Sequence, residues 1–398
     1  RIKSLVMMST DDMVNWTYHG IIDVNSIAPW IMASWAPSIV KRKESDGKTH
    51  FYLYFSNSGF GTGVLTATSP VGPWSSPLNK SLIDANTPGL GDCKVPFDPG
   101  TVIDANGTGW LTVGAGSSCI MRLGKDMISI DSEIVKMNAP HHFEANEMNY
   151  INGTYVYTYN TDWQDYSDWN YTAEKPTKCS MFYMTSKTPL DKTSWKYHNN
   201  YLKNPGDYGL GFSNNHTHLH KFRDKWYLFY HTLTLQSSFN TDGGFRNVCV
   251  DEINVDEKNV HIFMGNQTLK GVDQIQPLNP FIFQQAETTA ATQNIKFSQS
   301  PEVGNMYAGL SNGEEGLICL RGVKFSKKPS SFAAKVCGKG IIEVRRGTPS
   351  GEIIATLMVN NGNMEIIKSG VLKKFKGQTD LYFVLKGQSL SFDSWKFE

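Results

Sequence analysis

Two carboxylates, a histidine and a tryptophan occupy the same position in four repeated units of this sequence. They are Trp35, Asp98, Glu144 and His216. Each unit continues through a turn into a second strand that is rich in aromatic residues. Two carboxylates in unlike surroundings are the usual means of cleaving a glycosidic bond, with one of them acting as an acid. The repeat therefore indicates acid–base chemistry on a sugar, provided that the fold brings these side chains together.

A β-propeller would bring them together. The units recur about every 45–70 residues, which is the spacing of propeller blades, and helical periodicity is nearly absent. In a propeller the first strand of every blade lines the central axis, so the four side chains would face one cavity. We expect burial and a neighbouring negative charge to keep the acid protonated near neutral pH.

Each of these residues also has a plainer interpretation. Asp98 could cap a proline turn, Glu144 could be a solvated surface residue, and Trp35 could belong to the core. A histidine such as His216 is often satisfied within the core, or it could hold a water or a cation on the axis. The shared position in the repeat favours the functional interpretation for the two carboxylates, and Trp35 could stack on a sugar ring.

Two further segments carry candidate substrate contacts. Arg246, at the end of the run Gly243-Gly244-Phe245-Arg246, could bind a substrate hydroxyl or carboxylate, or could be an ordinary surface arginine. Residues 162–171 are rich in aromatics and aspartates and lack strand alternation, which predicts a long loop. That loop could form a sugar-binding rim or pack against itself.

The repeat ends after Ile262, and two domains are predicted. Residues 1–276 form a five-bladed β-propeller, and residues 277–398 form a separate β-sandwich of ordinary module size. The strands expected in the sandwich are Ser331 to Val336, Gly340 to Arg345, Ile353 to Val359, Leu381 to Leu385 and Ser391 to Phe397.

The first blade is expected to be incomplete at the N-terminus. A Ser/Thr-rich strand followed by a turn to tryptophan marks the end of a blade, and its first copy lies at Met8 to Trp16. The inner strands of that blade should come before Arg1.

Composition argues against two classes of partner. The formal net charge is +1 with 19% charged residues, and no apolar run reaches the roughly 18 residues of a membrane span. We therefore expect no nucleic acid and no membrane, and a monomer. The six cysteines lack the spacing of a zinc site, although Cys319 and Cys337 could form a disulfide. Asn-x-Ser/Thr sequons favour a secreted, extracellular glycoprotein and begin at Asn15, Asn79, Asn106, Asn152, Asn170, Asn215 and Asn266.

The motifs at these positions resemble glycoside hydrolase family 43, a family of inverting enzymes built on a five-bladed β-propeller. The matching motifs are SWAPS at Trp35, PFDPG at Asp98, FEA at Glu144, SNNH at His216 and GFR at Arg246. Within the family the chain looks most like the arabinoxylan arabinofuranohydrolases, which release α-L-arabinofuranosyl side chains from xylan. The alternatives are a β-xylosidase or arabinanase on the same scaffold, or a non-catalytic propeller that binds polysaccharide.

The resemblance also implies a role for each residue. Glu144 matches the general acid, and Asp98 matches the carboxylate that orients the acid and tunes its pKa. His216 matches an axial histidine that holds a central calcium ion through water. A substrate contact is implied for Arg246, and we also expect Trp35 and Phe97 to contact the substrate. No organic cofactor is implied.

The general base departs from the family pattern. In the family it is an Asp in a first-blade Asp-Pro motif, whereas Asp98-Pro99 is the only Asp-Pro in this sequence. We expect the base to lie upstream of Arg1. Inversion needs that base to activate water, so we expect these 398 residues alone to be a badly impaired or inactive catalyst.

The C-terminal segment resembles a family 6 carbohydrate-binding module. The resemblance rests on Gln285-Ala286-Glu287, on residues 340–345 and on residues 392–397. It implies a structural calcium ion bound by the carboxylates of Glu287, Glu343 and Asp393. At the position of the usual sugar-stacking aromatic the chain has residues 316–319, so a sugar-binding module and a purely structural sandwich both remain open.

Overall fold

The computed structural model describes residues 2–387 and 389–398. Strands form nearly all of the regular structure, which confirms the all-β class. The helices are short: α1 (Val24–Ile27), α2 (Thr234–Ser238) and the 3-10 helices η1 (Ser58–Phe60) and η2 (Pro205–Tyr208). In the part of the chain described, no helix has the length and apolar character needed to cross a membrane.

The chain divides into two compact units. The first contains Arg1–Leu5 and Asp23–Gly271, and the second contains Val6–Ile22 and Val272–Glu398. The boundary expected from sequence, between residues 276 and 277, lies close to the second of these divisions. The N-terminal hairpin differs from the expectation. It groups with the second unit because β2 (Trp16–Ile22) pairs with β20 (Thr288–Thr289).

Four antiparallel sheets and one short ladder make up the first unit in the described residues. The sheets are β3 (Trp35–Lys43), β4 (Thr49–Ser56) and β5 (Thr62–Ala67); β6 (Gly100–Ile103), β7 (Gly109–Val113), β8 (Cys119–Arg122) and β9 (Val135–Lys136); β10 (His142–Ile151), β11 (Thr154–Thr161), β12 (Met181–Ser186) and β13 (Lys196–Leu202); and β14 (Thr217–Phe222), β15 (Lys225–Thr232) and β16 (Asn247–Ile253). The ladder pairs β17 (Val255–Asp256) with β18 (His261–Ile262).

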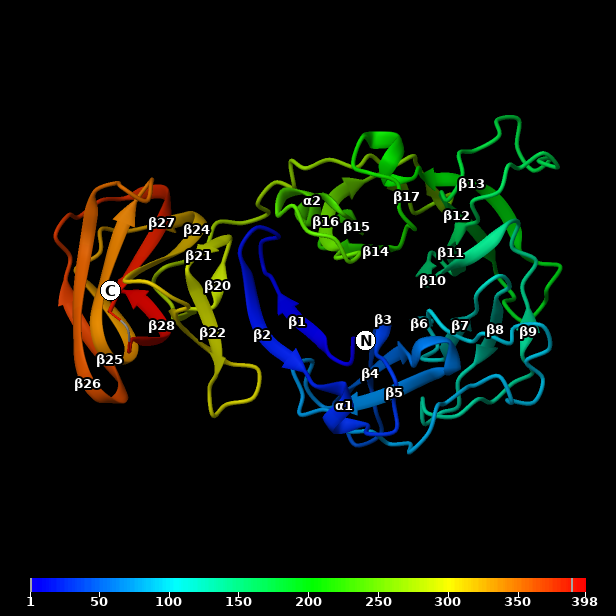
Figure 1. The fold of residues 1–398 in the computed structure, drawn as a ribbon, viewed down its shortest axis with the longest axis horizontal. Coiled ribbons are helices and arrows are strands. Elements are labelled where there is room, and N and C mark those ends of the chain that lie inside the picture. The colour runs from blue at the N-terminus through cyan, green and yellow to red at the C-terminus, as the bar shows by residue number, and fades with distance from the viewer. Residues whose placement is uncertain (1, 388) are drawn as a thin grey trace. The chain divides into compact units, whose positions relative to one another are not determined.

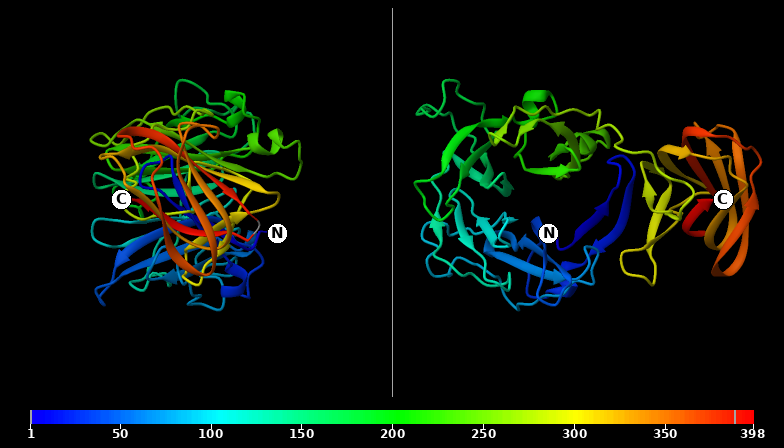
Figure 2. Two further views of the ribbon diagram at one scale, coloured as in Figure 1. Left: turned by 90° about the vertical axis from the view of Figure 1, so that its left-hand side faces the viewer. Right: turned by 180° about the vertical axis from the view of Figure 1, so that it is seen from behind.

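These sheets have the organisation of propeller blades. Within each sheet the strands pair in chain order. The sheets follow one another around an arc, and the first strand of each, β3, β6, β10 or β14, lies on its inner side (Figure 1; seen from behind in Figure 2). The total of five blades stays a prediction.

One strand shows why the sequence folds in this way. β11 follows a turn in which Asn152 and Gly153 both have positive φ, of 47° and 74°, as a tight hairpin requires. The strand is buried along its whole length. Val156 joins the core shared with the β14–β16 sheet, whereas Tyr155 and Tyr157 join the core shared with the β6–β9 sheet. Alternating side chains therefore fill the space between one blade and each of its neighbours.

The second unit is built on a nine-stranded sheet that forms a β-sandwich. Its strands are β19 (Gln284–Gln285), β21 (Ala291–Gln293), β22 (Ile295–Gln299), β23 (Met306–Leu310), β24 (Glu315–Phe325), β25 (Ser331–Arg346), β26 (Ile353–Gly370), β27 (Gly377–Lys386) and β28 (Ser391–Phe397). A smaller sheet joins β1 (Leu5–Ser9), β2 and β20. The core is apolar and aromatic, with Phe332, Phe383 and Trp395 almost fully buried.

Two expected features of this unit are corrected. The strands expected at Ser331 to Val336 and Gly340 to Arg345 are one strand, β25. A register irregularity beside Gly338, which has φ of 102°, bends it. Its first half pairs with β28 and its second half with β27, so one strand passes between two neighbours, as strands do at the corners of sandwiches. Cys319 and Cys337 are free, and the disulfide joins Cys93 to Cys119 in the first unit.

Candidate active site

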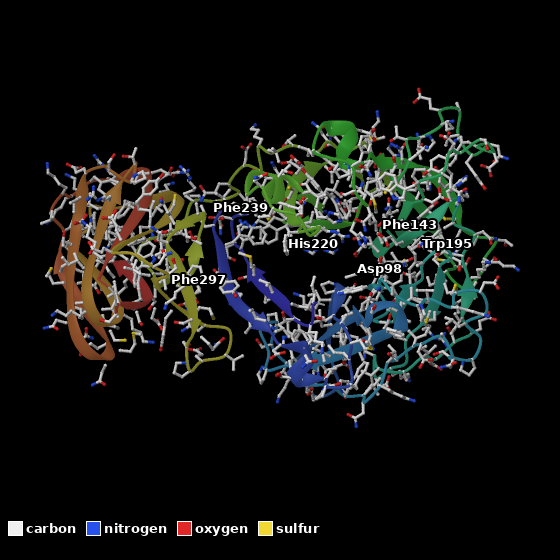
Figure 3. All side chains as sticks on the ribbon, viewed as in Figure 1. Asp98, Phe143, Trp195, His220, Phe239 and Phe297 are labelled. Atoms are coloured by element: carbon white, nitrogen blue, oxygen red, sulfur yellow. A yellow bond between two sulfur atoms is a disulfide. The ribbon has the colours of Figure 1, made fainter. Side chains whose placement is uncertain are left out.

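The inner strands bring three of the four repeated side chains together. A carboxylate oxygen of Asp98, a carboxylate oxygen of Glu144 and a ring nitrogen of His216 all lie within 4.8 Å of one another. His216 Nε2 is 3.2 Å from Glu144 Oε1 and 3.7 Å from Asp98 Oδ2. Asp98 lies on the inner side of the arc (Figure 3). Both carboxylates are buried, at 3% and 8% exposure.

Irregular backbone turns these residues away from ordinary strand geometry. Asp98 and Ala145 have φ of 51° and 63°, and Ala36, which follows Trp35 as Ala145 follows Glu144, has φ of 43°. The register between β10 and β11 shifts on both sides of Glu144. Bulges of this kind re-aim a side chain, and each left-handed residue costs about 1–3 kcal/mol. The fold tolerates this strain where it places the two carboxylates.

Asn146 fixes Asp98 against the neighbouring sheet. Its Nδ2 donates to the carbonyls of Asp98, at 3.0 Å, and Gly114, at 2.9 Å. The backbone N–H of Ala145 donates to Asp98 Oδ2 at 2.9 Å. A Cβ added to Gly100 would lie 2.7 Å from the Glu147 Cα, so only glycine allows β6 to approach β10 this closely. The spacing of Asp98 and Glu144 is therefore set by backbone contacts.

Asn214 links Glu144 to Arg246. Asn214 Nδ2 donates to Glu144 Oε1 at 2.5 Å, and Arg246 Nη2 donates to Asn214 Oδ1 at 2.8 Å. A guanidinium can only donate, so Arg246 requires the amide to present its oxygen and leaves its NH₂ group for Glu144. Sequence reasoning did not select Asn214. Its position in the Ser213-Asn214-Asn215-His216 turn was the available signal.

These contacts determine the ionisation of Glu144. Burial acts to raise the pKa of its carboxyl, but the hydrogen bond and charge of His216 and the amide of Asn214 outweigh burial, and the charge of Arg246 adds to them. The pKa of Glu144 therefore lies below its ordinary value. This corrects the expectation that burial keeps Glu144 protonated.

The pKa values of Asp98 and His216 shift in the opposite direction and lie above their ordinary values. Burial raises the pKa of Asp98; the charge of His216 opposes this without cancelling it, and the charge of Glu144 raises the pKa further. Burial lowers the pKa of His216, but the charges of Asp98 and Glu144 outweigh burial and raise it above its ordinary value. In the free protein His216 therefore holds a proton more readily than Glu144 does, because the pKa of the imidazole lies above its ordinary value and the pKa of the Glu144 carboxyl lies below its ordinary value.

A pocket of about 300 Å³ opens beside this group, with Asp98 and His216 on its wall. Ala36 and Pro37 of the first sheet also line it. Their neighbour Trp35 is 36% exposed and is not among the three side chains that converge. A role for Trp35 in stacking on a sugar stays a prediction.

The other two expected substrate contacts have different surroundings. Phe97 is half-buried, and its carbonyl accepts from the backbone N–H of Gly114 at 2.9 Å. Arg246 is exposed and is linked to Glu144 through the Asn214 amide. Two hydrogen bonds in series therefore connect Arg246 to Glu144.

The three converging residues do not fit a directly bound calcium ion. Calcium takes six to eight oxygen ligands, whereas one of the three donors here is a nitrogen. Glu144 Oε1 also already accepts hydrogen bonds from Asn214 and His216. An axial calcium held by His216 through water stays a prediction.

Two of the three carboxylates expected to bind calcium in the second unit lie together. Glu287 is 1% exposed, and the charge of Asp393 acts on it. Glu287 Oε2 and Asn305 Oδ1 are buried without a hydrogen-bond partner in the described residues, and Asn305 Nδ2 donates to Asp393 Oδ2 at 3.1 Å. These unpartnered oxygens fit calcium, although the Lys335 amine, 3.3 Å from Asp393 Oδ2, competes for the same charge.

Glu343 is not part of this group, which corrects the expected set of three. Lys386 Nζ lies 2.7 Å from its Oε1, and Arg345 Nη2 lies 2.6 Å from its Oε2. Glu343 lies on the half of β25 that pairs with β27, whereas Asp393 lies on β28, which pairs with the other half. The bend in β25 therefore separates them.

Comparison with known proteins agrees with this architecture. The family model for glycosyl hydrolases family 43 matches residues 1–260. An arabinoxylan arabinofuranohydrolase of Bacillus subtilis (strain 168) is 33% identical, with 100% of this chain and 83% of the relative covered. One of Paenibacillus polymyxa is 31% identical, with 100% and 67% covered.

A solved structure extends the match to the fold of both units. It is a family 43 arabinoxylan arabinofuranohydrolase from Bacillus subtilis in complex with cellotetraose. The TM-score is 0.90 at 32% identity, over 99% of this chain and 87% of that chain. The chain therefore belongs to glycosyl hydrolase family 43.

Proposed function

We propose that this protein is an inverting glycosidase that releases α-L-arabinofuranosyl side chains from arabinoxylan. The observation that carries the proposal is the buried carboxylate of Glu144, which lies beside Asp98 and His216, two residues that line a pocket. The two arabinoxylan arabinofuranohydrolases that align with the whole chain support the choice of substrate.

Glu144 acts as the proton donor. Its Oε1 accepts from Asn214 and His216, and among the described residues no hydrogen bond reaches its Oε2. Oε2 is therefore the oxygen that can carry a proton towards the glycosidic oxygen. A bound sugar that displaces water raises the pKa of the carboxyl, so Oε2 takes up a proton from solvent, while His216 stays hydrogen-bonded to Oε1 at 3.2 Å.

Asp98 positions the acid. The Ala145 N–H donates to Asp98 Oδ2, so this carboxylate holds the backbone immediately after Glu144. Inversion also requires a carboxylate on the opposite face of the sugar to activate water, and we assign no residue of this chain to that role.

The test is arabinose release from arabinoxylan by the full chain, with the anomer first formed identified by proton NMR. We expect the β anomer, and a loss of about 10²–10⁴-fold in Glu144→Gln, the usual contribution of a general acid. Full activity in Glu144→Gln would overturn the acid assignment. Release of xylose, or cleavage of linear arabinan, would favour the alternative activities, and binding without release would favour a non-catalytic propeller.

We also infer export from the cell and a calcium ion in the second unit. The Cys93–Cys119 disulfide suits an oxidising compartment. Of the sequon asparagines, Asn15 and Asn215 are buried, so glycans would occupy the exposed ones. For calcium, the expected result is a higher Tm on adding the ion to the wild type and no change in Glu287→Gln.

A further inference from the structure

The turn that supplies both hydrogen bonds to Glu144 Oε1 has no regular structure of its own. Asn214 and His216 make these two bonds. Residues 211–216, between η2 and β14, belong to no helix or strand. The buried backbone groups of such a segment need partners from side chains or water. The contacts that hold this turn therefore decide whether Asn214 can reach Glu144.

Asn204 contacts the turn from inside the protein. Its side chain is fully buried, at 0% exposure, and burying an amide is costly unless it is hydrogen-bonded. Asn204 Nδ2 donates to the carbonyl of Ser213, at 2.7 Å, and to the carbonyl of Cys179, at 3.1 Å. Both protons of the NH₂ group are therefore used. The Ser213 carbonyl belongs to the peptide group that leads into Asn214, so Asn204 fixes the backbone immediately before Asn214.

The oxygen of the same amide caps η2. Asn204 Oδ1 accepts from the backbone N–H of Gly206 at 3.0 Å, and the backbone N–H of Asn204 donates to Asp207 Oδ2 at 3.1 Å. The oxygen thus serves local structure, whereas the NH₂ group serves the turn and a segment 25 residues earlier in the sequence. A serine would keep the cap, since serine is a preferred N-cap residue, but its shorter side chain would not reach the two carbonyls. Substitution can therefore separate the two roles.

The hydrogen bond from Asn214 to Glu144 is sensitive to a small movement of the turn. Its Nδ2 and Oε1 atoms are 2.5 Å apart. A displacement of about 1 Å would bring them to about 3.5 Å, beyond the ordinary range of a hydrogen bond. The Cys179 thiol also donates to the Ser213 carbonyl, at 3.6 Å, but a thiol is a weak donor. Asn204 therefore supplies the stronger of these two hydrogen bonds to the turn.

We propose that Asn204 is a positioning residue for the acid. It holds the peptide group that leads into Asn214, and Asn214 in turn holds Oε1 of Glu144, which leaves Oε2 for the substrate. The inference rests on the proposed function for the role of Glu144 as the proton donor. The contact between Asn214 and Glu144 can nevertheless be measured without any catalysis.

The first test is the NMR signal of the Asn214 side-chain NH₂ group in the isotope-labelled full chain, assigned with Asn214→Ala. We expect a downfield proton in the wild type, because the bond to a carboxylate is short and charge-assisted, and we expect its loss in Asn204→Ser. Asp207→Ala is the matched control. It removes the other half of the η2 cap but leaves both carbonyl contacts of Asn204 in place, so the downfield proton should remain.

Asn204→Asp is a second variant that keeps the size of the side chain and the cap oxygen. It turns a carboxylate oxygen towards the Ser213 and Cys179 carbonyls, which repels them, and it should also abolish the downfield proton of Asn214. An unchanged Asn214 signal in either folded variant would overturn the proposal. Loss of the signal in the variants of a chain that releases no arabinose would uphold the positioning of Glu144 and refute its role as the acid.

Kinetics distinguish positioning of the acid from general damage to the fold. Asn204→Ser should lower kcat on an arabinoxylan oligosaccharide about 10–100-fold with little change in KM, because a displacement of about 1 Å can cost that much. Hydrolysis of dinitrophenyl arabinofuranoside, whose leaving group needs no proton, should stay near the wild-type rate. The double variant with Asn214→Ala should be no slower than Asn214→Ala alone, since the two residues act in series. Equal losses on both substrates, or losses that multiply in the double variant, would overturn the proposal.

Discussion

Removing the Asn214 amide should raise the pKa of Glu144. Asn214 Nδ2 donates to a buried, ionised carboxylate at 2.5 Å. A hydrogen bond to a charged group contributes about 1.5–3 kcal/mol, and a change of one pKa unit corresponds to about 1.36 kcal/mol. Asn214→Ala should therefore raise the pKa of Glu144 by about 1–2 units. The sign follows because the amide stabilises the charged form alone.

The assay is a pH titration of the Glu144 carboxyl carbon by NMR in protein labelled at glutamate, assigned with Glu144→Gln. Asn199→Ala, which changes an exposed asparagine of the same unit, is the control and should leave the titration unchanged. In an active preparation, the alkaline limb of kcat/KM should move to higher pH by the same amount, since the acid stays protonated longer. An unchanged Glu144 titration in Asn214→Ala would refute the reasoning.

Three further changes have defined outcomes. Burial raises the pKa of Glu287 from 4.5 to about 7. Without calcium the folded protein therefore keeps a proton between these pH values that the unfolded chain releases. The free energy of unfolding should fall as the pH rises from about 4.5 to 7. In urea denaturation with EDTA, Glu287→Gln should remove about 3 kcal/mol of that fall. An unchanged dependence of the unfolding free energy on pH in the variant would contradict this. Gly100→Ala forces β6 away from the β10 backbone and should cost about 1–3 kcal/mol of unfolding free energy. Gly59→Ala is the control and should change the unfolding free energy little, because Gly59 is an exposed residue of the same unit where an added Cβ would lie 3.7 Å from Val95 Cγ1, an ordinary contact. Arg246→Ala should raise the pKa of Glu144 by less than Asn214→Ala does, because Arg246 is exposed and acts through the amide; an equal or larger rise by NMR would show that charge outweighs the hydrogen bond.

The sequence identified the converging side chains because their position is a local property. Asp98, Glu144 and His216 each lie at the start of an inner strand, and the repeat of strand, turn and aromatic strand is visible without a structure. The prediction that Glu144 stays protonated was wrong for a physical reason. Burial can be inferred from apolar neighbours, but the donors that outweigh it, His216 and Asn214, come from a turn about 70 residues further along the chain.

In the second unit, too, contacts between distant parts of the chain could not be predicted from the sequence. Gly338 interrupts the strand pattern and suggests two strands, whereas the structure bends one strand around it. The acidic residues Glu287, Glu343 and Asp393 look alike in sequence. Only the pairing of β25 with two different strands reveals that Glu343 lies apart from the others and is neutralised by Lys386 and Arg345.

The central claim is that Glu144 donates the proton to the departing sugar, and the dependence of rate on the leaving group tests it most directly. The measurement is kcat/KM of the wild type and Glu144→Gln on an arabinoxylan oligosaccharide and on dinitrophenyl arabinofuranoside, whose leaving group departs without a proton. We predict a loss on the order of 100-fold or more on the oligosaccharide and little loss on the dinitrophenyl substrate. An equal loss on both substrates would contradict the claim.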